Sequence, residues 1–227
     1  MSLQAHLGEE WYELLKDEFD KEYFKNLRNI LAVEYATQTV YPSKEDIFKA
    51  YRETPYSKVR VVIIAQDPYF TPGHAHGLAF SHPSHDPCLR TAPSLRNIFK
   101  ELESDLGDEG FDALHDDDLT RWARQGVFLL NRSLTVREGK PDSHANIGWL
   151  SFTWKTIELI TQKDNPVIFA LWGNKAKLVK PLILPPHEYT ESAHPSPLSC
   201  KGFFGTRPFS RINAFLVKHY NNKINWV

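Results

Sequence analysis

The chain has 227 residues, of which 41% are hydrophobic and 13% aromatic, so it is long enough to bury one sizeable core. A formal net charge of -1 argues against a nucleic-acid partner if only the total counts, because phosphate binding depends mainly on Lys and Arg. The two cysteines, Cys88 and Cys200, are too few for a disulfide framework and lack zinc-site spacing, which favours free thiols in a reducing compartment.

The first sixty residues have helical patterns over 11–19 ("WYELLKDEF") and 23–36 ("YFKNLRNILAVEYA"). We expect this part (1–58) to pack on the same core as the remainder, giving one domain over residues 1–227. The N-terminus lacks a basic region followed by an apolar run, and no stretch approaches the length of a membrane span. We therefore expect a soluble, cytoplasmic monomer that does not contact a membrane.

Four short segments beyond residue 58 have the character of strands: 59–65 ("VRVVIIA"), 126–131 ("GVFLLN"), 166–173 ("PVIFALWG") and the weaker 188–194 ("EYTESAH"). The first three are almost continuously apolar, which is typical of strands covered on both faces. Helical patterns separate and follow them, at 94–106, 119–125, 148–160 and 207–222. This alternation predicts an α/β fold, a three-layer α/β/α sandwich with a central four-stranded parallel sheet.

Each predicted strand ends in polar or conformationally special residues, within "AQDPY", "LNRS", "LWGNKAK" and "AHPSPLS". Parallel α/β sheets bind ligands at the carboxyl ends of their strands. We therefore expect one crevice that brings together Gln66, Asp67, Asn131, Gly173 and His194.

Asp67 has two interpretations. It can be a turn carboxylate that accepts backbone N–H bonds, as Asp-Pro sequences favour, or a general base or anion beside developing positive charge. Under the second interpretation, Pro68 stiffens the loop and Tyr69 forms a wall of the pocket. A glycosidase with paired carboxylates needs a second Asp or Glu at another strand end, and none is there. Bond cleavage at this crevice would therefore use one carboxylate and a neutral group.

His194 and Asn131 also have two interpretations each. His194 can be an ordinary loop histidine, but the flanking Pro195 and Pro197 stiffen the loop, which suits a donor aimed at a developing oxyanion. Asn131 can cap a turn. Its amide also offers a donor and an acceptor side by side, which matches the edge of a nucleobase or of another amide.

Four histidines in the segment 74–85 (His74, His76, His82, His85) invite a metal, but their spacing matches no zinc pattern. We expect no metal and no cofactor. Charge is segregated along the chain: residues 101–118 hold nine acidic and no basic residues, whereas 192–227 hold five Lys or Arg and no Asp or Glu. Segregation leaves room for a local positive face on a neutral molecule, although a solvated terminal helix gives a similar pattern.

Seven motifs, in order, resemble those of uracil-DNA glycosylase, family 1: "QDPY", "AHGLAFS", "APSLRNIFKEL", "LLNRSLTVR", "SHANIGWLSFT", "LWGNKAK" and "HPSPLS…GFFG". The resemblance extends from about Trp11 to the C-terminus. It implies a DNA repair enzyme that flips deoxyuridine out of DNA and hydrolyses its N-glycosidic bond, without metal or cofactor.

The resemblance implies roles for six pocket residues. Asp67 resembles the carboxylate that positions water and stabilises an oxocarbenium-like sugar, and His194 the neutral imidazole that hydrogen-bonds uracil O2. Asn131 resembles the amide that contacts uracil N3–H and O4. The three remaining matches are Phe80, which stacks on the flipped base, Tyr69, which excludes the thymine methyl group, and Gln66, which helps to hold base and water.

The resemblance also implies DNA contacts. Leu198 matches the wedge that enters the duplex where the nucleotide has left, and we call residues 194–203 the wedge loop. The matches to loops that pinch the phosphates are Pro93, Ser94, Gly173, Asn174 and Ser196, and Lys201 is expected beside them. The implied partners are uracil-containing DNA, single- or double-stranded, and the phage-encoded inhibitor protein of this family, whose fit depends on the altered wedge loop.

The sequence departs from the family pattern at several positions. Phe70 stands where the family usually has His, which leaves Asp67 and the water without that hydrogen-bond partner and predicts a lower rate. The wedge loop is one residue shorter than usual, which bears on the reach of Leu198 and on what Lys201 contacts. The other departures are Ala65, Thr71, Ala92 and Asn174.

These departures leave three alternatives to uracil excision. The first is a glycosylase of the same fold with a different base preference, for which Phe70 and the short loop are the motivation. The second is a catalytically silent DNA- or nucleotide-binding module, and retention of Asp67 and His194 argues against it. The third is a metal hydrolase that uses the His-rich segment, which predicts inhibition by chelators.

Overall fold

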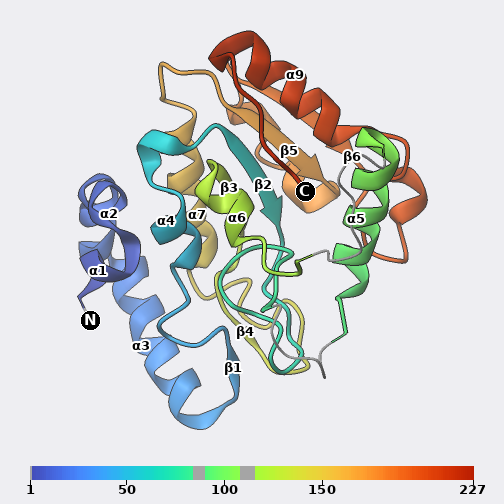
Figure 1. Ribbon diagram of the computed structural model, residues 1–227. Helices are drawn as coiled ribbons and strands as arrows, with labels where there is room; N and C mark the ends of the chain where they lie inside the picture. Colours follow the sequence, from blue (N-terminus) through green and yellow to red (C-terminus); the bar gives the residue numbers. More distant parts are fainter. Residues whose placement is uncertain (1, 84–89, 108–115) are drawn as a thin grey trace.

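The computed structural model describes residues 2–83, 90–107 and 116–227 (Figure 1). The helices are α1 (Leu3–Leu7), α2 (Glu9–Leu15), α3 (Glu22–Thr37), α4 (Lys49–Glu53), α5 (Pro93–Leu106), α6 (Thr120–Arg124), α7 (Trp149–Ile160), α8 (Asn174–Lys177) and α9 (Pro208–Tyr220). The strands are β1 (Val40–Tyr41), β2 (Val61–Ala65), β3 (Val127–Asn131), β4 (Val136–Arg137), β5 (Ile168–Trp172) and β6 (Glu188–Ser192).

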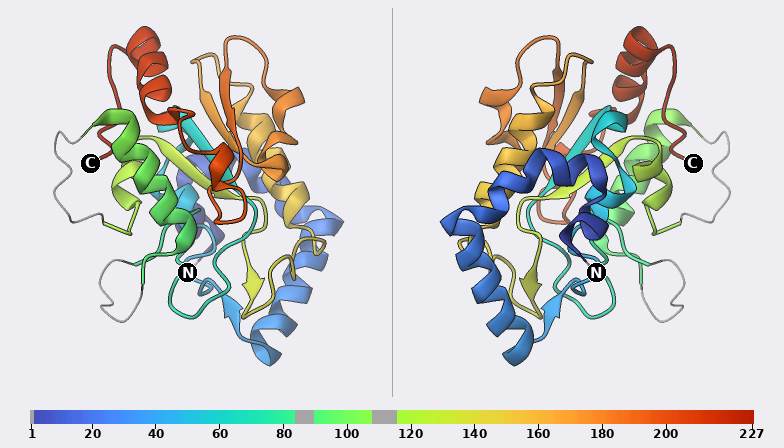
Figure 2. Two further views of the ribbon diagram at one scale, coloured as in Figure 1. Left: turned by 90° about the vertical axis from the view of Figure 1, so that its right-hand side faces the viewer. Right: turned by 90° about the vertical axis from the view of Figure 1, so that its left-hand side faces the viewer.

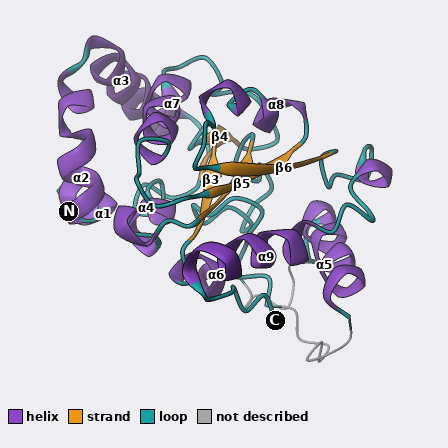
Figure 3. Cartoon of the chain, turned by 90° about the horizontal axis from the view of Figure 1, so that it is seen from above, coloured by secondary structure: helices purple, strands orange, loops and turns teal. Residues whose placement is uncertain are grey.

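A parallel four-stranded sheet in the order β3-β2-β5-β6 forms the centre of the molecule. Every residue of β2, β3 and β5 is buried, which is why these strands are almost continuously apolar in sequence. Figure 3 shows α3 and α7 on one side of the sheet and α5, α6 and α9 on the other. The predicted fold class, a three-layer sandwich around a four-stranded parallel sheet, is confirmed.

The N-terminal helices pack directly on the sheet. Trp11 of α2 is fully buried, and its ring stacks on that of Phe128 in β3 with 5.1 Å between centroids. Its Nε1–H donates to the carbonyl of Thr54 at 2.8 Å. Residues of the first sixty therefore share their buried surface with the strands. In the described parts of the chain, no helix combines enough length and apolar character to cross a membrane.

Several elements differ from those that the sequence predicts. The expected helix over 11–19 is α2 followed by a 3-10 turn over Lys16–Asp20. The short antiparallel pair β1–β4, which lies at the end of the molecule opposite α9 in Figure 2, has only two residues in each strand. Segments this short carry no periodicity, and α1, α4 and α8 are missed for the same reason.

A buried polar network joins α3 to the segment that follows β3. Glu34 accepts two hydrogen bonds from the Arg137 guanidinium and one from the Nε2–H of His144, at 3.2 Å. The Nδ1 of His144 lies 2.8 Å from the hydroxyl of Thr135, which also accepts from Trp149 Nε1. The hydrogen bonds from Arg137 are the main cause that lowers the pKa of Glu34 to about 2. The network fixes residues 132–149 against α3.

We predict that Glu34→Gln lowers the free energy of unfolding at neutral pH by about 2 kcal/mol, the order expected for hydrogen bonds to a charged group. The pKa of Glu34 is lower in the folded than in the unfolded state, so its contribution is complete above about pH 4.5 and is lost as the pH falls towards 2. Urea unfolding measured from neutral to acidic pH should show the two proteins converging. Glu13→Gln, which breaks an exposed ion pair with Lys16, is the control and should change stability little; an equal loss in both variants would contradict the prediction.

A candidate active site at the carboxyl ends of the strands

A cavity of about 640 Å³ opens at the carboxyl end of β2. Its lining includes Asp67 and His194, which lie 127 positions apart in sequence and come from the loops after β2 and β6. Parallel strands explain this meeting, because their carboxyl ends share one edge of the sheet. The structure therefore places the candidate carboxylate and the candidate imidazole on one cavity.

Asp67 is two residues beyond β2 and is partly buried in the cavity wall. Its Oδ2 accepts the backbone N–H of Asp142 at 2.7 Å, and Gln66 Nε2 lies 3.5 Å away. Burial raises the pKa of Asp67 above its ordinary value, and the hydrogen bond from Asp142 opposes that shift. The other carboxylate oxygen, Oδ1, has no hydrogen-bond partner among the described residues, which leaves it available to a ligand.

His194 is held in one tautomer. Its Nδ1 accepts the backbone N–H of Ser196 at 3.0 Å, so the proton of the neutral ring is on Nε2. Burial lowers the pKa of His194 below its ordinary value, which keeps the imidazole neutral at pH 7. An Nε2–H on a ring in the cavity lining is a hydrogen-bond donor of fixed position without a positive charge.

Gly173 is what allows His194 to lie this close to β5. Its φ is 91°, in the region that favours glycine, and a Cβ built on it would lie 2.9 Å from the Cβ of His194. Any side chain at this position would push the imidazole out of place.

Two aromatic side chains form rigid walls of the cavity. The hydroxyl of Tyr69 donates to the carbonyl of Phe80 at 2.8 Å, which fixes the tyrosine ring. Phe80 has a φ of 65°, rare for an aromatic residue, and its ring lies 5.7 Å from the imidazole of His194 and 5.6 Å from the ring of Trp172. Strained backbone of this kind persists where the surroundings hold it, often at a ligand site.

Asn131, the last residue of β3, pairs in register with Ala65, whose side chain lines the cavity. Asn131 is only 4% exposed, and its Oδ1 is buried without a hydrogen-bond partner among the described residues. Asn131 is not among the residues that line the cavity. Leaving a buried acceptor unpaired costs about 1–3 kcal/mol, so a ligand N–H that reached this oxygen would be bound favourably.

Of the seven residues expected to contact DNA, two line the cavity and the other five do not. Pro93 and Ser94 begin α5 and line the cavity. Asn174 is exposed at the start of α8, and Leu198 is 99% exposed on the wedge loop. Lys201 is exposed on a 3-10 turn of the same loop and does not line the cavity.

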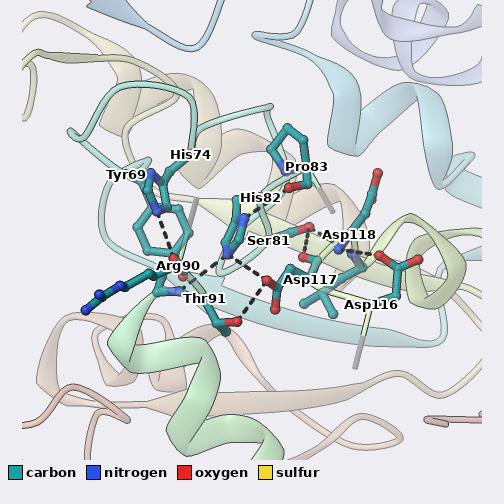
Figure 4. A network of polar contacts seen from close by, with 12 residues as sticks. Tyr69, His74, Ser81, His82, Pro83, Arg90, Thr91, Asp116, Asp117 and Asp118 are labelled. Atoms are coloured by element: carbon teal, nitrogen blue, oxygen red, sulfur yellow. Dashed lines mark hydrogen bonds and ion pairs between the residues drawn. The ribbon is translucent and has the colours of Figure 1, made fainter. Parts of the chain in front are cut away.

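The histidines after Tyr69 support this rim through hydrogen bonds (Figure 4). His82 is 1% exposed, and its Nε2 accepts the backbone N–H of Ala92 at 3.3 Å, just before α5. His74 contacts the carbonyls of Pro72 and Arg90 through its two ring nitrogens, at 3.1 Å and 3.2 Å. Figure 4 shows the contact from His74 to Arg90 and those from His82 to Pro83 and Asp117.

Within the described ranges, no group of three or more His, Cys, Asp or Glu side chains is arranged to hold a metal ion. His76 hydrogen-bonds Lys49 and Ser81 through its two ring nitrogens. His85 and Cys88 lie outside the described residues. In the described chain, the histidines of this segment are therefore occupied in holding loops together.

Sequence reasoning missed two features of the site. The backbone N–H of Asp142 reaches Asp67 from a residue with a φ of 60°, and no sequence pattern indicates this hydrogen bond. Arg90 and Arg96 line the cavity and are its only Lys or Arg residues in the described chain. Arg96 belongs to the quoted "APSLRNIFKEL", so the missed signal was its charge beside a predicted phosphate loop.

Comparisons with known proteins point to one family. A model described as the uracil DNA glycosylase superfamily matches residues 52–217. The uracil-DNA glycosylase of Clostridium perfringens (strain SM101 / Type A) is 49% identical over 230 residues, covering 99% of this chain and 98% of its own. That of Geobacillus kaustophilus (strain HTA426) is 50% identical over 226 residues, covering 97% and 94%.

Solved structures agree with these matches. The crystal structure of mimivirus uracil-DNA glycosylase superposes with a TM-score of 0.89 at 29% identity, covering 100% of this chain and 89% of that one. A variant of mimivirus UNG crystallised in complex with UGI gives a TM-score of 0.87 at 29% identity, covering 99% and 90%.

We predict that Gly173→Ala displaces the imidazole of His194, because the new Cβ would lie within 2.9 Å of the histidine Cβ. NMR of the ring nitrogens should show a neutral Nε2–H tautomer at pH 7 in the parent protein and shifted His194 signals in the variant. Gly205→Ala is the control: its φ of 78° also disfavours a side chain, but no atom of the described residues lies within 4 Å of its Cβ. Unchanged His194 signals in the Gly173 variant would contradict the steric argument.

Proposed function

The chain belongs to the uracil DNA glycosylase superfamily, and from this premise we propose that it hydrolyses the N-glycosidic bond of deoxyuridine in DNA. The products are free uracil and an abasic site. The enzyme class, a glycosylase that acts in DNA repair, follows from the family. The substrate contacts and the reaction mechanism are our proposal.

One observation carries the proposal: Asp67 and His194 line one cavity. Asn131 is outside that lining, but its register partner Ala65 belongs to it, and the Oδ1 of Asn131 has no hydrogen-bond partner among the described residues. Uracil presents an N–H at position 3 between two carbonyl oxygens. An amide acceptor, an amide donor and an imidazole N–H match that edge. A carboxylate on the same cavity supplies negative charge for the sugar side of the bond.

A base inside a duplex cannot reach this cavity, so the nucleotide must leave the stack at a cost of a few kcal/mol. Leu198 offsets that cost in the proposal by entering the space that the base has left. Its side chain is 99% exposed, which makes it available for this contact. Single-stranded DNA avoids most of the unstacking cost, and both forms are proposed substrates.

Cleavage of the C1′–N1 bond leaves its electron pair on uracil and positive charge on the sugar. Asp67 stabilises that sugar cation and takes a proton from the water that attacks C1′. His194 donates its Nε2–H to uracil O2, where negative charge develops. A neutral donor held by Ser196 costs no reorganisation when the bond breaks, and one such donor contributes a factor of about 10²–10³ in other enzymes.

Uracil differs from thymine by one methyl group, which a pocket can exclude only by steric contact. The ring of Tyr69, locked by its hydrogen bond to Phe80, supplies the contact in this proposal. Excluding a larger substrate with a fixed ring is easier than detecting a missing methyl group, which is worth about 1–3 kcal/mol. Phe80 stacks on the flipped base.

Phe70 motivates a second candidate within the same reaction class, a glycosylase with a broader base preference. Its side chain is 41% exposed and lines the cavity, so an apolar ring stands where the family usually has His. Comparing release of uracil, thymine and hydroxymethyluracil from defined oligonucleotides separates the two candidates.

The proposed partners are uracil-containing DNA and the inhibitor protein of this family, since a mimivirus relative was crystallised with UGI. The monomeric state and the cytoplasmic location stay predictions.

We predict that the protein releases uracil from a uracil-containing oligonucleotide in the presence of a chelator, because the proposed route uses one carboxylate, one neutral imidazole and water. Asp67→Asn should lower the rate by about 10²-fold or more, since a general base is worth about 10²–10⁴-fold. DNA binding by this variant, followed by fluorescence anisotropy, should persist. The absence of uracil release by the parent protein would favour a silent binding module, and inhibition by the chelator would favour a metal hydrolase.

We predict that Asn131→Asp loosens discrimination against cytosine. Cytosine offers an acceptor at N3 and a donor at N4, the reverse of uracil, so it leaves the Asn131 amide mispaired in the parent protein. A carboxyl group can accept from N4, and in its protonated form can donate to N3. Competition between uracil and cytosine release from matched oligonucleotides measures the effect, and strict uracil preference in the variant would count against this role.

A further inference from the structure

A second, smaller groove extends from the cavity along α5. It has a volume of about 300 Å³, and we call it the α5 groove after its lining residues Pro93, Arg96, Asn97, Lys100, Pro197 and Cys200. Three of them, Pro93, Arg96 and Pro197, also line the cavity described above. The groove is therefore continuous with the candidate active site.

The walls of the α5 groove are held together by a hydrogen bond. The side-chain amide of Asn97 donates to the carbonyl of Pro195 at 2.7 Å, which ties the wedge loop to α5. Figure 2 (left) shows α5, in green, beside the red loop that follows β6. The two walls of the groove, α5 and the wedge loop, are therefore held at a fixed distance from each other.

The charge of the groove is positive. Among the described residues, its lining contains Arg96 and Lys100 and no carboxylate. Both cations are exposed, and neither forms an ion pair with any described residue. Arg96 and Lys100 are separated by four positions on a helix, so they lie on one face, with Cβ atoms about 5–6 Å apart.

The acidic residues of α5 do not cancel this charge, because two of them are used on the opposite face. Glu101 is 1% exposed and accepts the backbone N–H groups of Gly205 and Arg207. Asp105 is 6% exposed and accepts from Ser210 and Arg207. On the exposed face of α5, Arg96 and Lys100 are followed by Glu103, so the row of positive side chains consists of these two cations.

We propose that the α5 groove binds the DNA backbone on one side of the flipped nucleotide, with Arg96 and Lys100 contacting successive phosphates. This inference rests on the proposed function. It adds a subsite beyond the cavity, next to Pro197 of the wedge loop, which lines both the cavity and the groove. The groove is a place for phosphates rather than bases, since two unpaired cations line it and its remaining residues offer no aromatic ring.

The test compares single-stranded oligonucleotides that differ in what flanks the uracil. One has a single nucleotide on each side, one extends by several nucleotides only on the 5′ side, and one only on the 3′ side. The variant is Arg96→Gln/Lys100→Gln, which keeps helix-compatible side chains. The matched control is Lys25→Gln/Arg28→Gln on the exposed face of α3, with the same change in net charge.

For the groove variant, we expect kcat/KM to fall more on one of the two extended oligonucleotides than on the short one. On that oligonucleotide, the dependence of log kcat/KM on log salt should flatten by about 1.4, at about 0.7 per phosphate for a single strand, so that the difference from the parent protein changes about sevenfold between 50 and 200 mM salt. The control variant should keep the ratios of the parent protein.

Equal losses on all three oligonucleotides, or equal losses in the two variants, would overturn the proposal, because both results indicate a general effect of charge. No loss on either extended oligonucleotide would also overturn it. Anisotropy with the same labelled oligonucleotides gives a readout that does not need base release. If the parent protein releases no uracil, the proposed function fails; if it releases uracil and the groove variant behaves as the parent, only the groove proposal fails.

Discussion

The burial of β2 between two parallel neighbours is the constraint on which the rest of the site depends. All five residues of β2 are buried, and its partners β3 and β5 run in the same direction. The chain can therefore expose polar groups only where the strand ends. The register places Ala65 beside Asn131, so Asp67 emerges next to a buried amide, and the loops after β5 and β6 bring Gly173 and His194 to the same edge. Moving any strand by one residue would separate these groups and turn buried side chains outward.

The net charge of -1 and a proposed DNA substrate are compatible because carboxylates and cations are used in different places. Glu34, Glu101 and Asp105 are buried and accept hydrogen bonds from the backbone or from neighbouring side chains. Their charges hold segments of the fold together and contribute little to the field outside. Arg96, an exposed cation on the rim of the cavity, has no ion-pair partner in the described part of the chain. Salt screens the interactions of exposed charges beyond about 8–10 Å. The local excess of positive charge at the rim therefore affects a bound phosphate more than the net charge of the whole molecule does.

Much of the fold was predictable from sequence, since strands buried on both faces must be almost continuously apolar and helices between them must be amphipathic. The meeting of strand ends followed from the parallel arrangement, which is why Gln66, Asp67 and His194 could be placed in one crevice. Contacts made by backbone atoms were not predictable, because an N–H leaves no mark on residue type. The hydrogen bonds from Asp142 to Asp67 and from Ser196 to His194 are of this kind. The sequence also could not predict that no described donor reaches the Oδ1 of Asn131.

Burial disfavours the charged form of both Asp67 and His194. The proposed reaction needs a charged Asp67 and a neutral His194. Desolvation disfavours the charged form of either group, so it raises the pKa of Asp67 and lowers that of His194. For the histidine this is the useful direction, because a neutral ring can donate to a leaving anion without a net charge already in place. For the aspartate it is the wrong direction, and the hydrogen bond from Asp142 opposes it only in part, since the pKa of Asp67 stays above its ordinary value. The segment that carries Asp142 is in turn fixed to α3 by the Glu34 network, so the ionisation of the proposed catalytic carboxylate depends on a structure outside the cavity.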